Sequence, residues 1–287
     1  MSTYAHRLLR DIQFSNQRIL STLPDLILTS FDEGEVIWRK GRSVQSWNYI
    51  VAGYVATSIP IDEGRPLPLQ IFGPQAWFGE QPLINKQATH FEYTCLTPVE
   101  VIGMRKKSFD SAIAEEPDFM HYIAKLIAGR SQQQSEMLML MRLGSSPLRV
   151  VMGLAQYAEA LANSAAPRSS GLQKGEVDLP ITQQQIAALC GVSRTLFSEY
   201  LQLLARDGWL KVRYGGIELQ SLQTWRIFAR KQRECQSIRS RASLLELLDD
   251  MACAHEEIGP QGFPNLMTRR WLRLQTQSLC RAVPEAC

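Results

Sequence analysis

Polar side chains recur on one face of a predicted helix that begins near residue 194. They are Arg194, Thr195, Ser198, Glu199 and Gln202. Side chains of these types read base edges in the major groove of DNA, where arginine pairs with guanine, glutamine with adenine and glutamate with cytosine. This face therefore predicts sequence-specific contacts with DNA.

The surrounding residues predict how this helix is held. Its opposite face has apolar residues at i, i+3, i+4 and i+7, the spacing of a buried stripe: Phe197, Tyr200, Leu201 and Leu204. Ser193 is a good N-cap, and Gly191 accepts the left-handed backbone that a sharp turn needs. Thr182 and Gln185 fit a capping box at the start of a preceding helix. The sequence thus predicts two helices joined by a tight turn.

A hairpin pattern follows the second helix. Residues 209–213 and 217–219 flank Tyr214-Gly215-Gly216, a Gly-Gly turn typical of β-hairpins. On the first strand, Lys211 and Arg213 either contact phosphate or belong to a solvated face. Together these elements predict a winged helix-turn-helix, whose second helix fits the major groove. The alternative is an ordinary two-helix corner of an all-α domain.

The segment resembles the C-terminal domain of the CRP/FNR family of bacterial transcription regulators. The likeness rests on Ile181-Thr182, on the glycine before Val192-Ser193-Arg194, on a Leu-x-x-Leu spacing and on Asp207-Gly208-Trp209-Leu210. The resemblance implies a dimeric DNA-binding regulator that works at promoters with RNA polymerase.

The resemblance also carries DNA contacts onto positions of this chain. Thr182 and Gln183 lie at the start of the first helix, where family members contact phosphate. Arg194 matches the arginine that follows the N-cap serine and reads guanine. Thr195 and Glu199 depart from the family, which often has glutamate and arginine at these two positions. We therefore expect an operator that differs from the best-known consensus.

The first hundred residues follow a different pattern. Short apolar runs alternate with glycines at strand-plus-turn spacing, namely Gly34, Gly41, Gly53, Gly64, Gly73 and Gly79. Such spacing predicts an antiparallel barrel or jelly roll. Residues 48–55 and Trp77-Phe78-Gly79-Glu80 resemble the β-roll and the nucleotide-binding cassette of the same family. We expect an α+β fold: an N-terminal antiparallel β-roll, a long dimerisation helix, a winged helix-turn-helix and extra C-terminal helices.

The cassette is the candidate effector site, formed by Gly79, Glu80, Thr89 and His90. In cyclic-nucleotide-binding relatives the glutamate binds the ribose hydroxyl, and an Arg-Ser pair holds the phosphate, which suits the planar guanidinium. The Arg-Ser position falls at Thr89-His90, and no arginine occurs between Arg65 and Arg105. We therefore expect no cyclic nucleotide as cofactor, and either another small molecule or none. Two alternatives stay open: a structural turn role for Glu80, and a strand-edge or core position for His90.

A long helix is predicted from about residue 118 to 142, after a short one over 106–116. Its apolar stripe has a polar middle, which suits a two-stranded seam. The resemblance implies that it pairs with its twin, with interface residues Phe119, Met120, Ile123, Ile127, Met137 and Leu140. A dimer would place two recognition helices on a palindromic operator. The alternative is a surface helix packed on its own barrel.

The chain continues well past the hairpin, where the family normally ends. Residues 221–241 are rich in arginine and lysine, with Trp225 and Phe228 at helical spacing among the charges. An apolar stripe continues to about residue 251, and a last helix is predicted over residues 266–280. We favour a helical buttress over extra DNA-backbone contact or an oligomer interface.

Composition is compatible with this interpretation. The 287 residues allow two domains, and a net charge of +3 means that DNA affinity must come from local patches. No apolar run of membrane-spanning length and no secretory h-region is visible. The six cysteines show no C-x-x-C pattern, and none precedes Cys95, which argues against a disulfide framework and an N-terminal iron–sulfur cluster. The cysteine pattern therefore predicts a protein of the reducing cytoplasm.

Four segments are expected: a β-roll sensor domain over 1–104, connecting and dimerisation helices over 105–146, the DNA-binding domain over 147–222 and a helical extension over 223–287. No G-x-S-x-G, P-loop or metal-ligand cluster appears, so we expect no enzyme and no metal. The expected partners are double-stranded DNA, a second copy of the chain and RNA polymerase, with no membrane. The alternative is an effector-binding module that no longer binds DNA.

Overall fold

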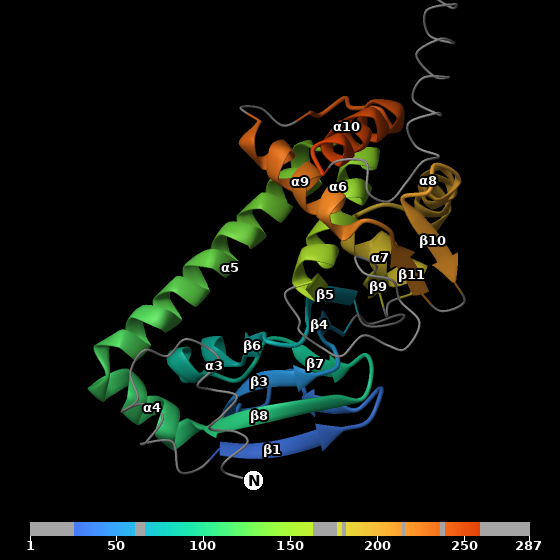
Figure 1. The fold of residues 1–287 in the computed structure, drawn as a ribbon. Helices are drawn as coiled ribbons and strands as arrows, with labels where there is room; N and C mark the ends of the chain where they lie inside the picture. Colours follow the sequence, from blue (N-terminus) through green and yellow to red (C-terminus); the bar gives the residue numbers. More distant parts are fainter. Residues whose placement is uncertain are drawn as a thin grey trace, which may run out of the picture. The chain divides into compact units, whose positions relative to one another are not determined.

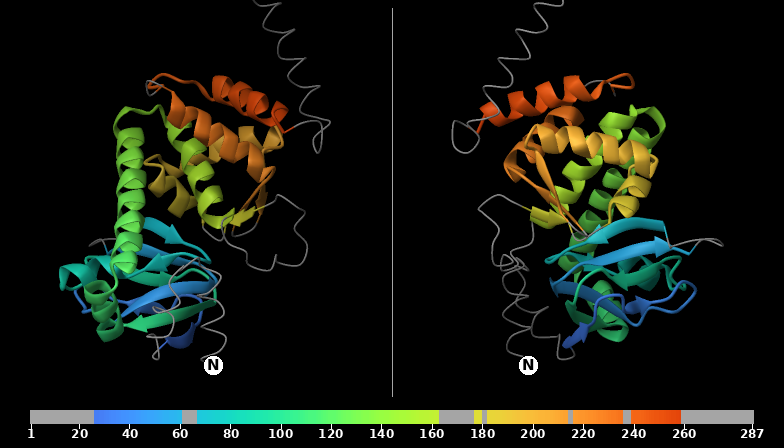
Figure 2. Two further views of the ribbon diagram at one scale, coloured as in Figure 1. Left: turned by 60° about the vertical axis from the view of Figure 1, so that its left-hand side comes forward. Right: turned by 90° about the vertical axis from the view of Figure 1, so that its right-hand side faces the viewer.

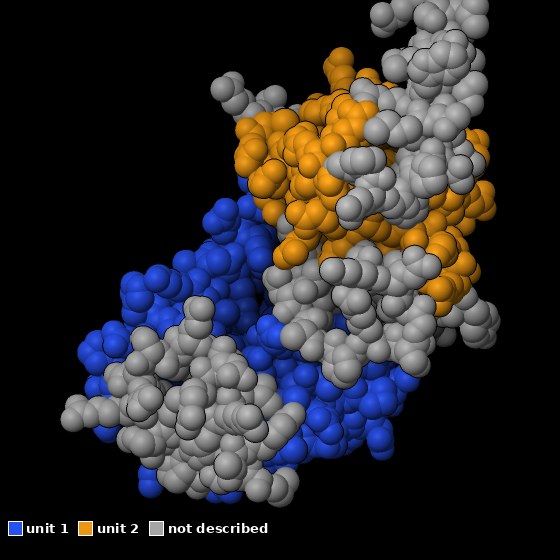
Figure 3. All heavy atoms as spheres, viewed as in Figure 1, with its two compact units in different colours: residues 1–139, 160–169 blue, residues 140–159, 170–287 orange. Residues whose placement is uncertain are grey.

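A computed structural model describes residues 26–60, 67–162, 177–179, 182–213, 216–235 and 239–258. Several predicted features lie outside these ranges: Gly64, Ile181, the Tyr214-Gly215 part of the hairpin turn and the helix over 266–280. The chain divides into two compact units (Figure 3), Met1–Met139 with Ala160–Ser169, and Leu140–Glu159 with Ser170–Cys287.

Unit 1 is built on two four-stranded antiparallel sheets (Figures 1 and 2). One sheet has the order β1 (Leu26–Phe31), β8 (Val99–Arg105), β3 (Ser46–Ala52) and β6 (Trp77–Phe78). The other has the order β2 (Val36–Trp38), β7 (Glu92–Cys95), β4 (Val55–Ile59) and β5 (Leu67–Phe72). Inward residues of both sheets form one apolar cluster, including Ile50, Val55, Phe78, Tyr93 and Val101. The predicted antiparallel β-roll is confirmed.

A second cluster joins the first sheet to its helices. The Trp47 and Trp77 rings stack with centroids 3.6 Å apart. Phe109 of α4 (Lys106–Glu115) and Phe119 of α5 (Pro117–Leu143) pack against Trp47. The short helix α3 (Glu80–Asn85) begins directly after β6 and completes this side of the roll.

This packing corrects two of the predicted dimer residues. Phe119 and Ile123 are 0% and 1% exposed and belong to the core of their own chain, because the first turns of α5 must cover Trp47. Leu140, 8% exposed, is also buried within its own chain, which contradicts its predicted place at the dimer interface. Met120 and Ile127 on the same helix are exposed, and Met137 is half-buried. The apolar surface that α5 leaves for a second copy of the chain is therefore narrower than its apolar stripe suggests.

Unit 2 contains α6 (Ser146–Ala162), the helix pair α7 (Gln183–Leu189) and α8 (Arg194–Arg206), and a three-stranded sheet. The sheet order is β10 (Leu210–Arg213), β11 (Gly216–Leu219) and β9 (Val177–Leu179). Helix α6 begins at Ser146, because the Ser145 hydroxyl accepts the Leu148 N–H at 3.4 Å and a proline is tolerated in a first turn. Strand β9 extends the predicted hairpin by one strand.

The extension adds α9 (Leu222–Glu234) and α10 (Leu244–Glu256), which run side by side in Figure 2. The predicted apolar stripe is interrupted between them, because Ser243 and Glu246 form a capping box that starts a new helix. Trp225, Phe228, Leu247 and Met251 are at most 1% exposed. The two helices thus share a core with each other.

Candidate nucleic-acid interface and effector site

The turn between α7 and α8 is built from local signals that the sequence predicted. Thr182 Oγ1 accepts the Gln185 N–H at 3.3 Å, and the Gln185 side chain accepts the Thr182 N–H at 3.0 Å. Ser193 Oγ accepts the Leu196 N–H at 3.2 Å. Gly191 has a φ of +61°, and a Cβ there would lie 2.8 Å from Met141 Sδ. The predicted caps and turn glycine are therefore confirmed.

Helix α8 has one buried and one exposed face. Phe197, Leu201 and Leu204 are at most 1% exposed. Arg194, Thr195, Glu199 and Gln202 are exposed, and Ser198 is half-buried. Burial raises the pKa of Tyr200 at the edge of the buried face, the Glu199 carboxylate adds to the rise and Arg149 opposes it. The helix thus presents base-reading side chain types outward, as the sequence predicted.

The two wing cations lie on β10 and pair with one acid that sequence reasoning missed. Lys211 Nζ lies 3.1 Å from Glu218 Oε1, and the Arg213 guanidinium pairs with Glu218 Oε2. Glu218 itself is 0% exposed. Its position opposite Lys211 in the predicted hairpin was the available signal, because facing residues of opposite charge pair across strands.

The base of the wing packs on the extension. Trp209 is buried, and its ring lies edge-on to His255 of α10 at 6.0 Å. The His255 Nδ1 lies 2.8 Å from Thr224 Oγ1, and Trp225 Nε1 donates to the Gln220 carbonyl at 2.9 Å. Burial lowers the pKa of His255, against an opposing effect of Glu256. The extension therefore belongs to the same packed unit as the wing.

The candidate effector residue Glu80 is buried at the start of α3 and pairs with Arg130 of α5. The Arg130 guanidinium also donates to the Trp77 carbonyl and lies 5.1 Å from the Phe72 ring centroid. Glu80 Oε2 is buried and lacks a hydrogen-bond partner among the described residues. Sequence reasoning missed Arg130, although a buried carboxylate calls for a cation from some part of the fold.

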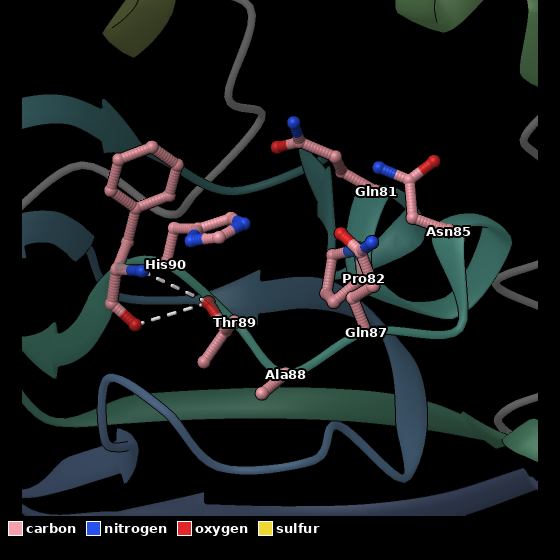
Figure 4. A pocket seen from close by; sticks show the side chains of 8 residues that line it. Gln81, Pro82, Asn85, Gln87, Ala88, Thr89 and His90 are labelled. Carbon is pink, nitrogen blue, oxygen red and sulfur yellow. Dashed lines mark hydrogen bonds between the residues drawn. The ribbon is translucent and has the colours of Figure 1, made fainter.

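The other three candidate effector residues, Gly79, Thr89 and His90, differ in conformation, hydrogen bonding and exposure. Gly79 has a φ of +99°, and a Cβ there would lie 2.7 Å from the Trp38 ring. The Thr89 hydroxyl is buried and bonds both the N–H and the carbonyl of Phe91, at 3.2 and 3.1 Å (Figure 4). His90 is exposed.

Thr89 and His90 line a small pocket whose other lining side chains are uncharged. The pocket is also lined by Gln81, Pro82, Asn85, Gln87, Ala88 and Phe91. In Figure 4 the amides of Gln81, Asn85 and Gln87 lie on its α3 side. Its lining residues therefore offer hydrogen bonds, but no arginine for a phosphate.

Membrane-spanning helices and metal-ligand clusters are both absent from the described residues. None of the described helices has the length and apolar character needed to cross a bilayer. The described part of the chain also brings together no group of three or more His, Cys, Asp or Glu residues suited to a metal ion.

Known proteins resemble both units. A family model described as the cyclic nucleotide-binding domain matches residues 28–116, and one described as the Crp-like helix-turn-helix domain matches residues 149–224. The chain is 26% identical over 185 residues to a "CRP-like cAMP-activated global transcriptional regulator" of Mycobacterium tuberculosis, covering 63% of this chain and 79% of that protein. It is 26% identical over 166 residues to the "cAMP-activated global transcriptional regulator CRP" of Salmonella typhimurium, covering 58% and 76%.

Solved structures show the same fold. FixK2 from Bradyrhizobium japonicum aligns with a TM-score of 0.58 at 16% identity, covering 70% of this chain and 96% of that one. The c-di-GMP responsive global regulator CLP from Xanthomonas campestris aligns with a TM-score of 0.54 at 18% identity, covering 71% and 99%. The two domain matches, in this order on one chain and with these relatives, show that the protein belongs to the CRP/FNR family of DNA-binding transcription regulators.

Proposed function

We propose that this regulator binds a palindromic operator as a homodimer, through the exposed face of α8, and controls transcription from that position. The observation that carries the proposal is the two-sided helix, with Arg194, Glu199 and Gln202 outward and Phe197 and Leu201 buried. The proposed DNA-facing residues are Thr182, Gln183, Ser193, Arg194, Thr195, Ser198, Glu199 and Gln202, with Lys211 and Arg213 on the wing.

The α5 helix supports the dimer. Five of its apolar side chains are between 40% and 56% exposed, namely Met120, Ile127, Leu138, Met139 and Leu143. A second copy would bury them, and it would supply the second recognition helix that a two-fold operator needs. We further propose that the protein acts in the cytoplasm without enzymatic turnover, and that operator position decides whether RNA polymerase is recruited or excluded.

The direct test compares Arg194→Ala with the wild type in mobility-shift titrations on genomic fragments at fixed salt. Loss of one guanine contact should cost about 1–3 kcal/mol of base discrimination and leave binding to mixed-sequence DNA nearly unchanged. Arg105→Ala removes an exposed arginine from β8 of unit 1. This control should change neither the base discrimination nor the binding to mixed-sequence DNA. If the wild type binds no fragment, the protein is an effector-binding module without DNA binding, and the proposal fails.

We propose that cAMP is not the effector, unlike in the two relatives described as cAMP-activated. The position that would hold the phosphate carries Thr89 and His90, and the Thr89 hydroxyl is already bonded to Phe91. Glu80, at the position that would bind the ribose hydroxyl, is buried and already paired with Arg130. An effector should therefore be a small molecule other than a cyclic nucleotide.

Calorimetric titration of the full chain with cAMP tests this second proposal. We expect no saturable heat and no change in operator affinity, because the Thr89-His90 position offers a cyclic phosphate no arginine and Arg130 is already paired with Glu80. Saturable binding that tightens operator binding would contradict it.

A further inference from the structure

A buried carboxylate lies beneath the two wing cations. Glu218 of β11 stands directly opposite Lys211 of β10 in the hairpin register. Arg213 is two residues further along β10, so its side chain leaves the sheet on the same face as that of Lys211. The three charged groups therefore share one face of the wing.

Both oxygens of this carboxylate are engaged. Glu218 Oε1 accepts from Lys211 Nζ at 3.1 Å and from Gln220 Nε2 at 2.6 Å. Glu218 Oε2 forms an ion pair with the Arg213 guanidinium but accepts no hydrogen bond from the described residues. The Glu218 side chain is 0% exposed, whereas those of Lys211 and Arg213 are 56% and 53% exposed. A buried carboxylate needs such partners, because an uncompensated buried charge is strongly destabilising.

The ion pairs with Glu218 change how strongly the wing attracts DNA phosphates. Lys211 and Arg213 are both paired with Glu218, so a phosphate must compete with this carboxylate for their donors. Charge-assisted hydrogen bonds are about twice as strong as neutral ones, so this competition weakens each wing–phosphate contact.

We propose that Glu218 is a positioning residue that restrains Lys211 and Arg213 and so limits the sequence-independent attraction of the wing to the DNA backbone. The inference rests on the proposed function, since it requires that the wing meets DNA. If the inference holds, Lys211 and Arg213 bind DNA phosphates more weakly than surface cations without an acidic partner would.

The test measures how binding of the full chain to a short duplex of mixed sequence depends on salt, between about 50 and 200 mM. Glu218→Gln keeps the size of the side chain and an oxygen acceptor for Lys211, but removes the charge. We expect tighter binding at low salt and a slope of log K against log salt that steepens by about 0.9 for each further phosphate that the wing neutralises. An unchanged or shallower slope would overturn the inference.

Glu234→Gln is the matched control. It removes the same charge from an exposed side chain of α9, 67% accessible, that pairs with Arg230 and with neither wing cation. Its slope should equal that of the wild type. A slope as steep as that of Glu218→Gln would mean that net charge alone acts, and would also overturn the inference.

If circular dichroism shows that Glu218→Gln does not fold, Arg213→Gln tests the inference instead. Because Arg213 is restrained, its removal should flatten the slope by well under 0.9, whereas loss of a full phosphate contact, about 0.9, would overturn the inference.

Arg194→Ala in parallel operator titrations separates failure of the inference from failure of the proposed function. Unchanged base discrimination in that variant counts against the proposed function, and an unchanged slope in Glu218→Gln counts against the inference alone.

Discussion

At the scale of single residues, the turn before α8 depends on one backbone conformation. Gly191 has a positive φ, and Met141 and Arg149 approach the position where a Cβ would be. The residue is thus needed both for its backbone freedom and for its lack of a side chain. A larger residue there would strain the turn and displace the Met141 side chain.

Gly191→Ala should therefore destabilise unit 2. The left-handed conformation alone should cost about 1–2 kcal/mol for a non-glycine residue, before any displacement of Met141. Chemical denaturation followed by tryptophan fluorescence measures the loss. Gly129→Ala is the control, because Gly129 lies in α5 with no atom within 4 Å of an added Cβ, and should stabilise by up to about 1 kcal/mol. Equal stabilities of the two variants would refute this explanation of the turn.

Residue roles were predictable where their causes are local. The Thr182–Gln185 box and the Ser193 cap act within three residues, so sequence spacing was enough. The Arg130 partner of Glu80 is 50 residues away, and only the folded β-roll brings them together. Likewise, the hairpin register could suggest that Glu218 faces Lys211, but its complete burial depends on the three-dimensional fold.

At the scale of elements, the C-terminal helices extend the DNA-binding unit. The match to the helix-turn-helix family model ends at residue 224, yet α9 and α10 pack together, and His255 of α10 contacts Trp209 at the base of the wing. The predicted buttress is supported by this packing. The break between α9 and α10 was missed, because the apolar stripe is nearly continuous and the Ser243–Glu246 signal was overlooked.

Two leucine substitutions in α10 test whether the extension supports the wing. Leu248 is 2% exposed and Leu245 is 53% exposed. Leu248→Ala should lower the free energy of unfolding by about 2–5 kcal/mol and weaken DNA binding in parallel, whereas Leu245→Ala should cost under about 1 kcal/mol. Thermal denaturation and mobility shifts measure both effects. Full DNA affinity in a destabilised Leu248→Ala protein would show that the extension is a separate appendage.

At the scale of the whole molecule, reading a two-fold operator requires two copies of the chain. The exposed apolar residues of α5 remain after Phe119 and Ile123 are assigned to the core of their own chain. The sequence could predict the amphipathic helix but not which part of its stripe would be used internally, because that depends on where the β-roll packs against it.

Ile127→Glu should separate the dimer into monomers. A carboxylate buried at a two-fold seam faces its own copy, and a single half-site should then bind only at the level of non-specific DNA, with Kd about 10⁻⁴–10⁻⁶ M. Light scattering after size exclusion measures the mass. Lys125→Glu, at an exposed position of the same helix, is the control and should stay dimeric. A dimeric Ile127→Glu protein would place the interface elsewhere.

The central claim is that α8 reads a two-fold DNA sequence through Arg194. Selection of bound duplexes from a random-sequence pool, with the full chain at fixed salt, tests it most directly. We predict an inverted repeat with half-site centres about 10 base pairs apart, or a multiple of that spacing, and loss of preference at one guanine of each half-site in Arg194→Ala. Binding without any enriched sequence, or an identical enriched sequence for both proteins, would contradict the claim.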